Sequence, residues 1–65
     1  MNNHKDLVDK LVEIRKKRNI TQVELAEKLN MKQPNLARIE KGGRVPSLQM
    51  LCGIANAVGA KIKIE

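Results

Sequence analysis

Four side chains near the middle of the chain have the types and the spacing needed to read the edges of base pairs. Gln33 and Arg38 can each form paired hydrogen bonds, the amide with adenine and the guanidinium with guanine. Ala37 carries a methyl group that can contact thymine, and Pro34 adds a stiff apolar surface nearby. On a helix these four residues would share the outer face, so we expect a base-reading surface there.

Two short helices joined by a sharp turn would position this face. Thr21 and Glu24 have the spacing of a capping box, which predicts a first helix over Gln22 to Leu29. Asn30 tolerates the left-handed conformation that ends a helix, and a second helix is expected over residues 33–40. Two helices in this arrangement are typical of the helix-turn-helix motif, whose second helix enters the major groove of DNA.

Several motifs in this stretch occur together in a fixed order. TQxELAxKL is followed by a Gln-Pro pair, then by ARIExG and PSLxxL. This pattern, across roughly residues 7–58, resembles the Cro/phage-repressor (Xre-type) helix-turn-helix family. The chain departs from the family pattern at Asn19 and Asn30, where Gly is usual, and at Lys32, where a small hydroxyl residue often precedes the recognition helix. Asn keeps the turn chemistry, whereas Lys32 predicts a weaker helix cap.

The resemblance implies a fold and a function. The fold is an all-α, compact four-helix lambda-repressor-like domain that spans residues 1–65 and carries the helix-turn-helix. The function is sequence-specific binding of double-stranded DNA by a transcriptional regulator, which in most cases is a repressor. Compact members that end in a short strand resemble HigA-type and HipB-type antitoxins, which would add a toxin protein as a partner. A stand-alone regulator is the alternative.

The resemblance also implies a structural ion pair. In the family, an Arg late in the first helix pairs with a Glu at the end of the recognition helix, and Arg15 and Glu40 match these positions. Such a pair would lock the two helices together if it is buried. The alternative is two independent surface charges that contribute almost nothing to stability.

Other polar and basic side chains are candidates for contacts with the DNA backbone. The run RKKR at residues 15–18 would stand beside a duplex bound by the recognition helix, although it could equally be a solvated helix end favoured by the helix dipole. The candidate phosphate contacts are Gln22, Arg18, Lys32, Lys41 and Arg44.

Composition narrows the class of function. The chain has 65 residues with a formal net charge of +6, which favours a polyanionic partner, and its lack of aromatic residues argues against base stacking in single-strand binding. One cysteine, Cys52, and one histidine, His4, form no catalytic or metal-ligating constellation, so we expect neither an enzyme nor a cofactor nor a metal site. No segment resembles a signal peptide or a membrane span, and we expect a cytoplasmic protein.

The remaining segments complete the expected domain. Residues 1–4 are expected to be a disordered arm, followed by an amphipathic helix over Lys5 to Arg18. The last helix is expected over Ser47 to Val58, after a loop that ends at Pro46. Its expected inner face consists of Leu48, Leu51, Ile54, Ala55 and Val58.

In the tail, residues 60–65, the spacing of apolar residues changes from the helical repeat to every second residue. Ile62 and Ile64 alternate with charged residues, which predicts a short C-terminal β-strand. A strand with no partner in its own chain could pair with its copy, so we expect a homodimer on a two-fold operator, held by Ile62 and Ile64. The alternative is a frayed tail or an edge strand that lies on its own domain.

A different class of function remains open. The same fold could serve as a protein-interaction adaptor, with its positive charge used for solubility or for an acidic partner. The predicted recognition helix lacks the aromatic anchors that are enriched at protein interfaces, which favours DNA.

Overall fold

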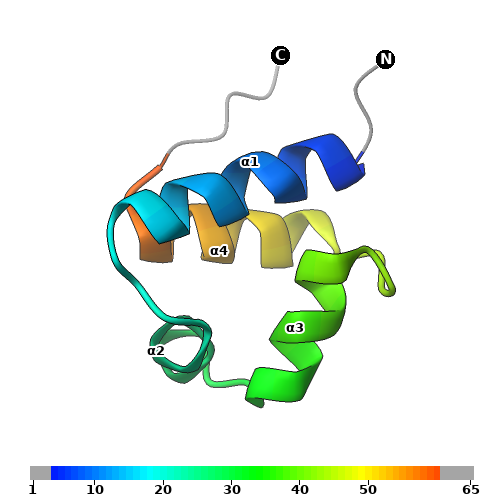
Figure 1. Ribbon diagram of the computed structural model, residues 1–65. Helices are drawn as coiled ribbons and strands as arrows, with labels where there is room; N and C mark the ends of the chain where they lie inside the picture. Colours follow the sequence, from blue (N-terminus) through cyan, green and yellow to red (C-terminus); the bar gives the residue numbers. More distant parts are fainter. Residues whose placement is uncertain (1–3, 61–65) are drawn as a thin grey trace.

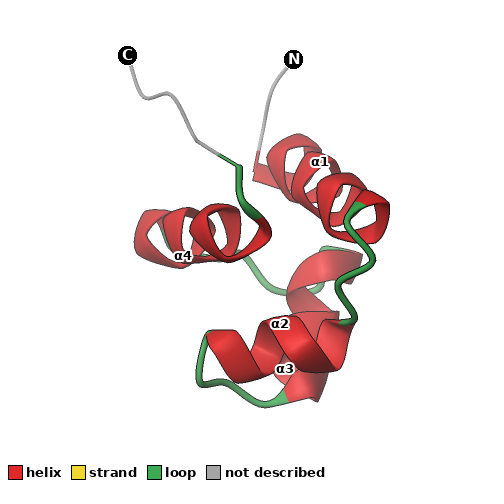
Figure 2. Ribbon diagram, turned by 90° about the vertical axis from the view of Figure 1, so that its left-hand side faces the viewer, coloured by secondary structure: helices red, strands yellow, loops and turns green. Residues whose placement is uncertain are grey.

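The computed structural model describes residues 4–60, which form four helices (Figure 1). The first helix packs along the last, and the two short helices lie below them, with α3 near the start of α4 and α2 near its end (Figures 1 and 2). The helices are α1 (His4–Lys17), α2 (Gln22–Lys28), α3 (Gln33–Lys41) and α4 (Leu48–Val58). The helix-turn-helix predicted from the sequence therefore corresponds to α2, the turn after it, and α3. Helix α1 begins at His4, one residue inside the segment predicted to be an arm.

Helix α2 is short and is held by a cap at its start. The Thr21 hydroxyl accepts a hydrogen bond from the Glu24 backbone N–H, and the Glu24 carboxylate accepts one from the Thr21 N–H, each at 3.0 Å. Leu29 ends the helix, and Asn30 follows with a φ of 54°, in the left-handed region. The predicted capping box and the predicted role of Asn30 are both confirmed.

Helix α3 begins and ends differently. Lys32 is its N-cap residue and provides no side-chain hydrogen bond, as the sequence predicted, while Pro34 occupies the first turn. Gly42 ends the helix with a φ of 84°, a conformation that side chains with a Cβ rarely adopt. The Lys5 side chain lies over this glycine, because a Cβ added there would meet its Cδ at 3.0 Å. The C-terminal end of α3 is thus covered by the start of α1.

Helix α4 is capped by Ser47, whose hydroxyl accepts a hydrogen bond from the Met50 N–H at 3.0 Å. The preceding Pro46 is buried. The predicted inner face is correct at four of its five positions and wrong at Leu48, the first residue of α4, which is 57% exposed. Cys52 is half-buried.

The core lies where all four helices meet and is entirely aliphatic. Its largest fully buried side chains are Leu25, Leu36, Ile39 and Val58, which come from α2, α3 and α4. Helix α1 adds Val8 and Leu11 from its inner face. Burial of one such side chain stabilises the folded state by about 1.5 to 3 kcal/mol. Leu36 and Ile39 are two of these side chains, so their burial both fixes α3 in place and stabilises the domain.

The predicted C-terminal strand is a correction to the expected fold class. Residues 4–60 contain four helices and no strand, and Ala60, the one described residue of the predicted segment, is not extended into a sheet. Its N–H instead donates to the Ala55 carbonyl at 2.7 Å, which closes the end of α4 around Gly59. Ile62 and Ile64, on which the strand dimer depended, lie outside the described residues.

None of the helices within residues 4–60 is both long and apolar enough to cross a lipid bilayer.

Candidate nucleic-acid interface

The four predicted base-reading residues all lie on α3. Pro34 and Arg38 are exposed one turn apart, while Gln33 and Ala37 form a second pair with the same spacing and are half-buried. The two pairs are adjacent on the outer side of the helix, opposite buried Leu36 and Ile39. The structure therefore places an amide, a methyl group and a guanidinium side by side on one helical face.

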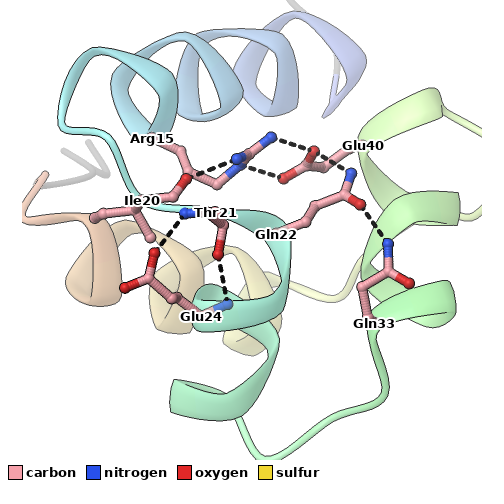
Figure 3. Close-up of polar contacts among 7 residues, drawn as sticks. All are labelled: Arg15, Ile20, Thr21, Gln22, Glu24, Gln33 and Glu40. Carbon is pink, nitrogen blue, oxygen red and sulfur yellow. Dashed lines mark hydrogen bonds and ion pairs between the residues drawn. The ribbon is translucent and has the colours of Figure 1, made fainter.

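Arg15 and Glu40 form a buried ion pair that joins α1 to α3. The Arg15 Nε donates to Glu40 Oε2 at 2.8 Å and its Nη2 donates to Glu40 Oε1 at 3.0 Å, with both side chains less than a tenth exposed. The Arg15 Nη1 donates to the Ile20 carbonyl at 2.7 Å. One guanidinium thus holds both the recognition helix and the loop that leads into α2 (Figure 3).

The ion pair continues into the two glutamines of the candidate site. The Gln22 Nε2 donates to Glu40 Oε1 at 2.8 Å, and the Gln22 Oε1 accepts from the Gln33 Nε2 at 2.6 Å. Figure 3 shows these side chains as one line that runs from α1 through α3 and α2 to the start of α3. We call Arg15, Glu40, Gln22 and Gln33 the polar chain.

The polar chain restricts what the Gln33 amide can present to a ligand. One of its two N–H groups is used for Gln22, so the second N–H and the carbonyl oxygen are outside the chain. An N–H donor next to a carbonyl acceptor is the pair of groups that adenine N7 and N6 require. The contact with Gln22 therefore holds the Gln33 side chain and leaves one N–H and the carbonyl oxygen outside the polar chain, the two kinds of group that contact with adenine would require.

The candidate phosphate contacts fall into three groups. Lys32, Lys41 and Arg44 are exposed at the start of α3, in its last turn and in the loop after it. Gln22 is half-buried within the polar chain and retains one N–H outside it. Arg18 is exposed, but its guanidinium lies against the end of α4, since a Cβ built on Gly59 would approach its Nη1 to 2.7 Å.

Arg18 thus lies next to the final carbonyls of α4, where a positive charge is favoured by the helix dipole. Lys5 has the same relation to the end of α3. Lys5 near the start of α1 and Arg18 just after its end therefore cover the C-terminal ends of α3 and α4. Neither contact could be found from sequence, because each depends on how the helices cross.

Sequence reasoning also missed the hydrogen bond between Gln22 and Gln33. Each glutamine was assigned separately, one to phosphate and the other to a base. The available signal was that both residues occupy the first position of a helix, and the helices are joined by a short turn. Two long amide side chains at adjacent helix starts can reach each other, and this pattern could have suggested the contact.

The model of the helix-turn-helix family matches residues 11–63, which include the second half of α1 and all of α2, α3 and α4. The chain belongs to the helix-turn-helix family. Members of this family are DNA-binding regulators, and the polar chain and the outer face of α3 both lie within the matched residues. The helix-turn-helix assignment and the resemblance to Xre-type repressors are thereby confirmed.

Two kinds of curated protein are similar to this helix-turn-helix chain. The immunity repressor protein of Bacillus phage phi105 is 47% identical over 49 residues, which are 75% of this chain and 34% of the repressor. The antitoxin HigA1 of Mycobacterium tuberculosis is 34% identical over 58 residues, which are 89% of this chain and 39% of the antitoxin. The chain thus spans little more than a third of the length of these relatives. No solved structure matches it significantly.

Proposed function

We propose that this helix-turn-helix chain is a sequence-specific DNA-binding domain that regulates transcription as a repressor, with α3 in the major groove of double-stranded DNA. Gln33 and Arg38 would read base edges, Ala37 would contact a thymine methyl, and Pro34 would add an apolar contact beside them. The proposed role is binding, without catalysis or a cofactor. The similarity to a phage immunity repressor supports the regulatory part of the proposal.

The observation that carries the proposal is the orientation of Gln33 by the polar chain. A glutamine side chain loses rotational freedom on binding, and a partner that already holds it reduces that cost. The bond from Gln22 at 2.6 Å supplies such a partner, while a buried ion pair holds Gln22 in turn. A surface residue with only a solubility role would not need such support.

The basic residues around α3 would supply the rest of the affinity. Lys32, Lys41 and Arg44 are exposed at the two ends of the helix, where the two DNA backbones border the major groove. Their contacts with phosphate would be independent of sequence and sensitive to salt. Gln22 and Arg18 would add to them, with Arg18 the weaker candidate because its guanidinium lies against Gly59.

Two copies would bind one operator. A single recognition helix reads only a few base pairs, and two half-sites about one helical turn apart multiply the affinity. We therefore propose a homodimer on a two-fold operator.

The regulator would belong to one of two systems. The 34% identity with the antitoxin HigA1 over 89% of this chain supports an antitoxin, with a toxin protein as its partner. The phage immunity repressor supports a stand-alone regulator. A small toxin gene adjacent to the gene for this chain would distinguish the first from the second.

The test is selection of bound sequences from random duplexes, followed by gel shifts across a salt series. The wild-type chain should select a defined sequence, and Gln33→Ala should lose preference at one position and about 1 to 3 kcal/mol on the selected site. Asn56→Ala, which removes an exposed amide from α4, is the matched control and should change neither the sequence preference nor the affinity for the selected site. An unchanged preference in Gln33→Ala would show that this residue does not read a base.

The same assay tests the rival function. If the wild-type chain binds no duplex even at low salt, the DNA proposal is wrong, because phosphate contacts are strongest there. The adaptor function would then be favoured.

A further inference from the structure

The polar chain has a fixed direction, because each of the two groups at its buried end can play only one part in a hydrogen bond. The Arg15 guanidinium can only donate, and an ionised carboxylate such as that of Glu40 can only accept. The Glu40 Oε1 accepts from Arg15 at 3.0 Å and from Gln22 at 2.8 Å. A side chain that joins the polar chain next to Glu40 must therefore donate to it.

This direction passes through Gln22 to Gln33 (Figure 3). A glutamine amide has a donor end and an acceptor end, and a half-turn of the amide exchanges them. In Gln22 the half-turn would bring its oxygen against the Glu40 carboxylate, so the NH2 group stays on Glu40 and the oxygen faces Gln33. Gln33 must then turn an N–H toward that oxygen, and it does so at 2.6 Å. One buried negative charge thus orients two amides.

The orientation of the Gln33 amide decides which of its groups remain for a base. With one N–H bonded to Gln22, the amide keeps one donor and one acceptor. Adenine offers the complementary pair in the major groove, an acceptor at N7 and a donor at N6. If the Gln33 oxygen were bonded to position 22 instead, two N–H donors would remain, and these match the two acceptors of guanine, N7 and O6.

We propose that Glu40 and Gln22 determine which base Gln33 reads, through the direction of the polar chain. Both are positioning residues in this role. The Glu40 side chain is 9% exposed and its oxygens are occupied by Arg15 and Gln22, so it acts on the base through Gln22 and Gln33. The inference rests on the proposed function, in which α3 reads base edges. A polar chain that only immobilised Gln33 would alter the affinity for every base alike, whereas a directed one alters the ratio of affinities for adenine and guanine.

Gln22→Lys should reverse the direction. A lysine ammonium can only donate, reaches as far as a glutamine amide, and would keep the Glu40 carboxylate paired. Its other N–H groups require the Gln33 oxygen as acceptor, which leaves Gln33 with two donors. Selection from random duplexes should therefore move from adenine to guanine at the position that Gln33→Ala identifies, with a change of at least about tenfold in the ratio of affinities for the two bases. The added positive charge strengthens binding to every duplex alike and does not alter this ratio.

Gln22→Met should remove the direction without reversing it. Methionine is about as long as glutamine, has no amide and leaves the pair of Arg15 with Glu40 intact, so this uncharged variant keeps the test if the lysine variant does not fold. The Gln33 amide can then turn freely, and the ratio of affinities for adenine and guanine should fall by about tenfold. Loss of a phosphate contact by Gln22 would lower the affinity for both bases equally. Gln49→Met makes the same replacement at an exposed position of α4 and should leave the ratio unchanged.

Hydrogen exchange of the Gln33 side-chain amide tests the direction in the free chain, without DNA. The bond to Gln22 protects one Nε2 proton in the wild type. Exchange with solvent should be several-fold faster in Gln22→Lys and in Gln22→Met, because neither variant offers an acceptor to this proton. The measurement is made well below the melting temperature of each variant, so that global unfolding does not contribute.

The outcomes separate the direction of the polar chain from the proposed function. A wild type that selects no sequence rejects DNA reading, and the inference falls with it. A wild type that selects a sequence, with a base at the Gln33 position that stays the same in Gln22→Lys, overturns the inference while DNA reading stands. Equal exchange of the Gln33 protons in the wild type and in Gln22→Met overturns it as well. A move from adenine to guanine in Gln22→Lys, with reduced discrimination in Gln22→Met, supports it.

Discussion

Arg15 makes three side-chain hydrogen bonds, which join two other segments of the chain to α1. Its guanidinium donates to both oxygens of Glu40 and to the Ile20 carbonyl, and the residue is 7% exposed. A charge this deeply buried is tolerated only when its donors are paired. Removal of the side chain would leave the Glu40 carboxylate buried with Gln22 as its remaining partner.

Arg15→Ala should therefore be strongly destabilising. We expect a loss of about 3 to 5 kcal/mol in the free energy of unfolding, because the change breaks a buried pair and leaves one charge uncompensated. Lys16→Ala, at the exposed neighbouring position, is the control and should stay within about 0.5 kcal/mol of the wild type. Thermal and urea melts of the two variants measure the difference.

A double-mutant cycle shows whether the pair itself causes the loss. In a Glu40→Gln background the penalty of Arg15→Ala should shrink, because no carboxylate is then left without its partner. Equal penalties in both backgrounds, or a melt of Arg15→Ala within error of the wild type, would contradict the role of the pair.

At the scale of elements, the two short helices of the motif differ in how they begin. Helix α2 has a complete capping box, and α3 has a lysine at its N-cap with no side-chain bond. The backbone of Lys32 is already in the extended conformation that N-cap residues adopt, with φ −82° and ψ 139°. The start of α3 lacks only a side chain that can accept a hydrogen bond from a backbone N–H of the first turn.

Lys32→Ser should supply that acceptor and stabilise the domain. We expect a gain of about 1 kcal/mol over Lys32→Ala, which also removes the charge but adds no cap. In a domain of this size such a gain raises the melting temperature by about 4 to 8 °C. Equal melting temperatures for the serine and alanine variants would show that the start of α3 does not limit stability.

The capping box of α2 predicts a dependence of stability on pH. The Thr21 backbone N–H donates to the Glu24 carboxylate and lowers the pKa of Glu24 below its ordinary value of 4.5. The ionised carboxylate therefore stabilises the folded state at pH above 4.5, and this contribution is lost as the pH falls through the lowered pKa.

Glu24→Gln should thus be less stable than the wild type at about pH 7, and the two should converge in acid, as the pH falls through the lowered pKa of Glu24. Urea melts across this range measure the difference. A difference that stays constant down to the lowest pH would mean that the carboxylate bond is not its source.

Sequence reasoning succeeded where local chemistry decides the structure. Thr21 with Glu24, and Asn30, act within one helical turn, and residue type alone indicates their role. It failed where tertiary packing decides. The spacing of Leu48 fits the inner face of α4, yet no other helix covers this side chain, which is 57% exposed. The alternation after Ala60 favoured a strand, but the Ala60 N–H is used to close α4.

For the candidate site the same division holds. The face shared by Gln33, Pro34, Ala37 and Arg38 follows from helical periodicity and could be predicted. The bond from Gln33 to Gln22 joins residues 11 positions apart. Their places at adjacent helix starts could have suggested the contact, but the contact itself depends on the angle between α2 and α3. The ion pair of Arg15 with Glu40 spans a longer separation and was expected only through the family resemblance.

At the scale of the whole molecule, charge is distributed unevenly along the chain. All charged residues of the described part lie in α1, α2, α3 and their loops, and none lies in α4. The eleven Lys and Arg against six Asp and Glu up to Arg44 give this part of the chain a net charge of +5, which would attract DNA over a distance of about 10 Å at moderate salt. The specific contacts of α3 would then act on a duplex that electrostatic attraction has already brought close.

Arg44→Ala should weaken binding to every duplex about equally and reduce the slope of log affinity against log salt by about one unit. Lys28→Ala removes the same charge from the last turn of α2, outside the candidate site, and should leave the slope nearly unchanged. Fluorescence anisotropy titrations of selected and random duplexes at several salt concentrations give both the affinity for each duplex and the salt slope. A loss confined to the selected sequence would identify Arg44 as a base-reading residue instead.

The polar chain has a consequence for how DNA preference can change during evolution. Gln33 is tied through Gln22 to the buried pair of Glu40 and Arg15, so its replacement disturbs groups that also hold the fold together. Pro34 and Arg38, in contrast, are exposed on the same face. If α3 reads DNA as proposed, substitutions at positions 34 and 38 would change the preferred operator at little cost in stability, whereas a substitution at position 33 would also disturb the fold. Descendants of this chain that read different operators should differ first at the two exposed positions.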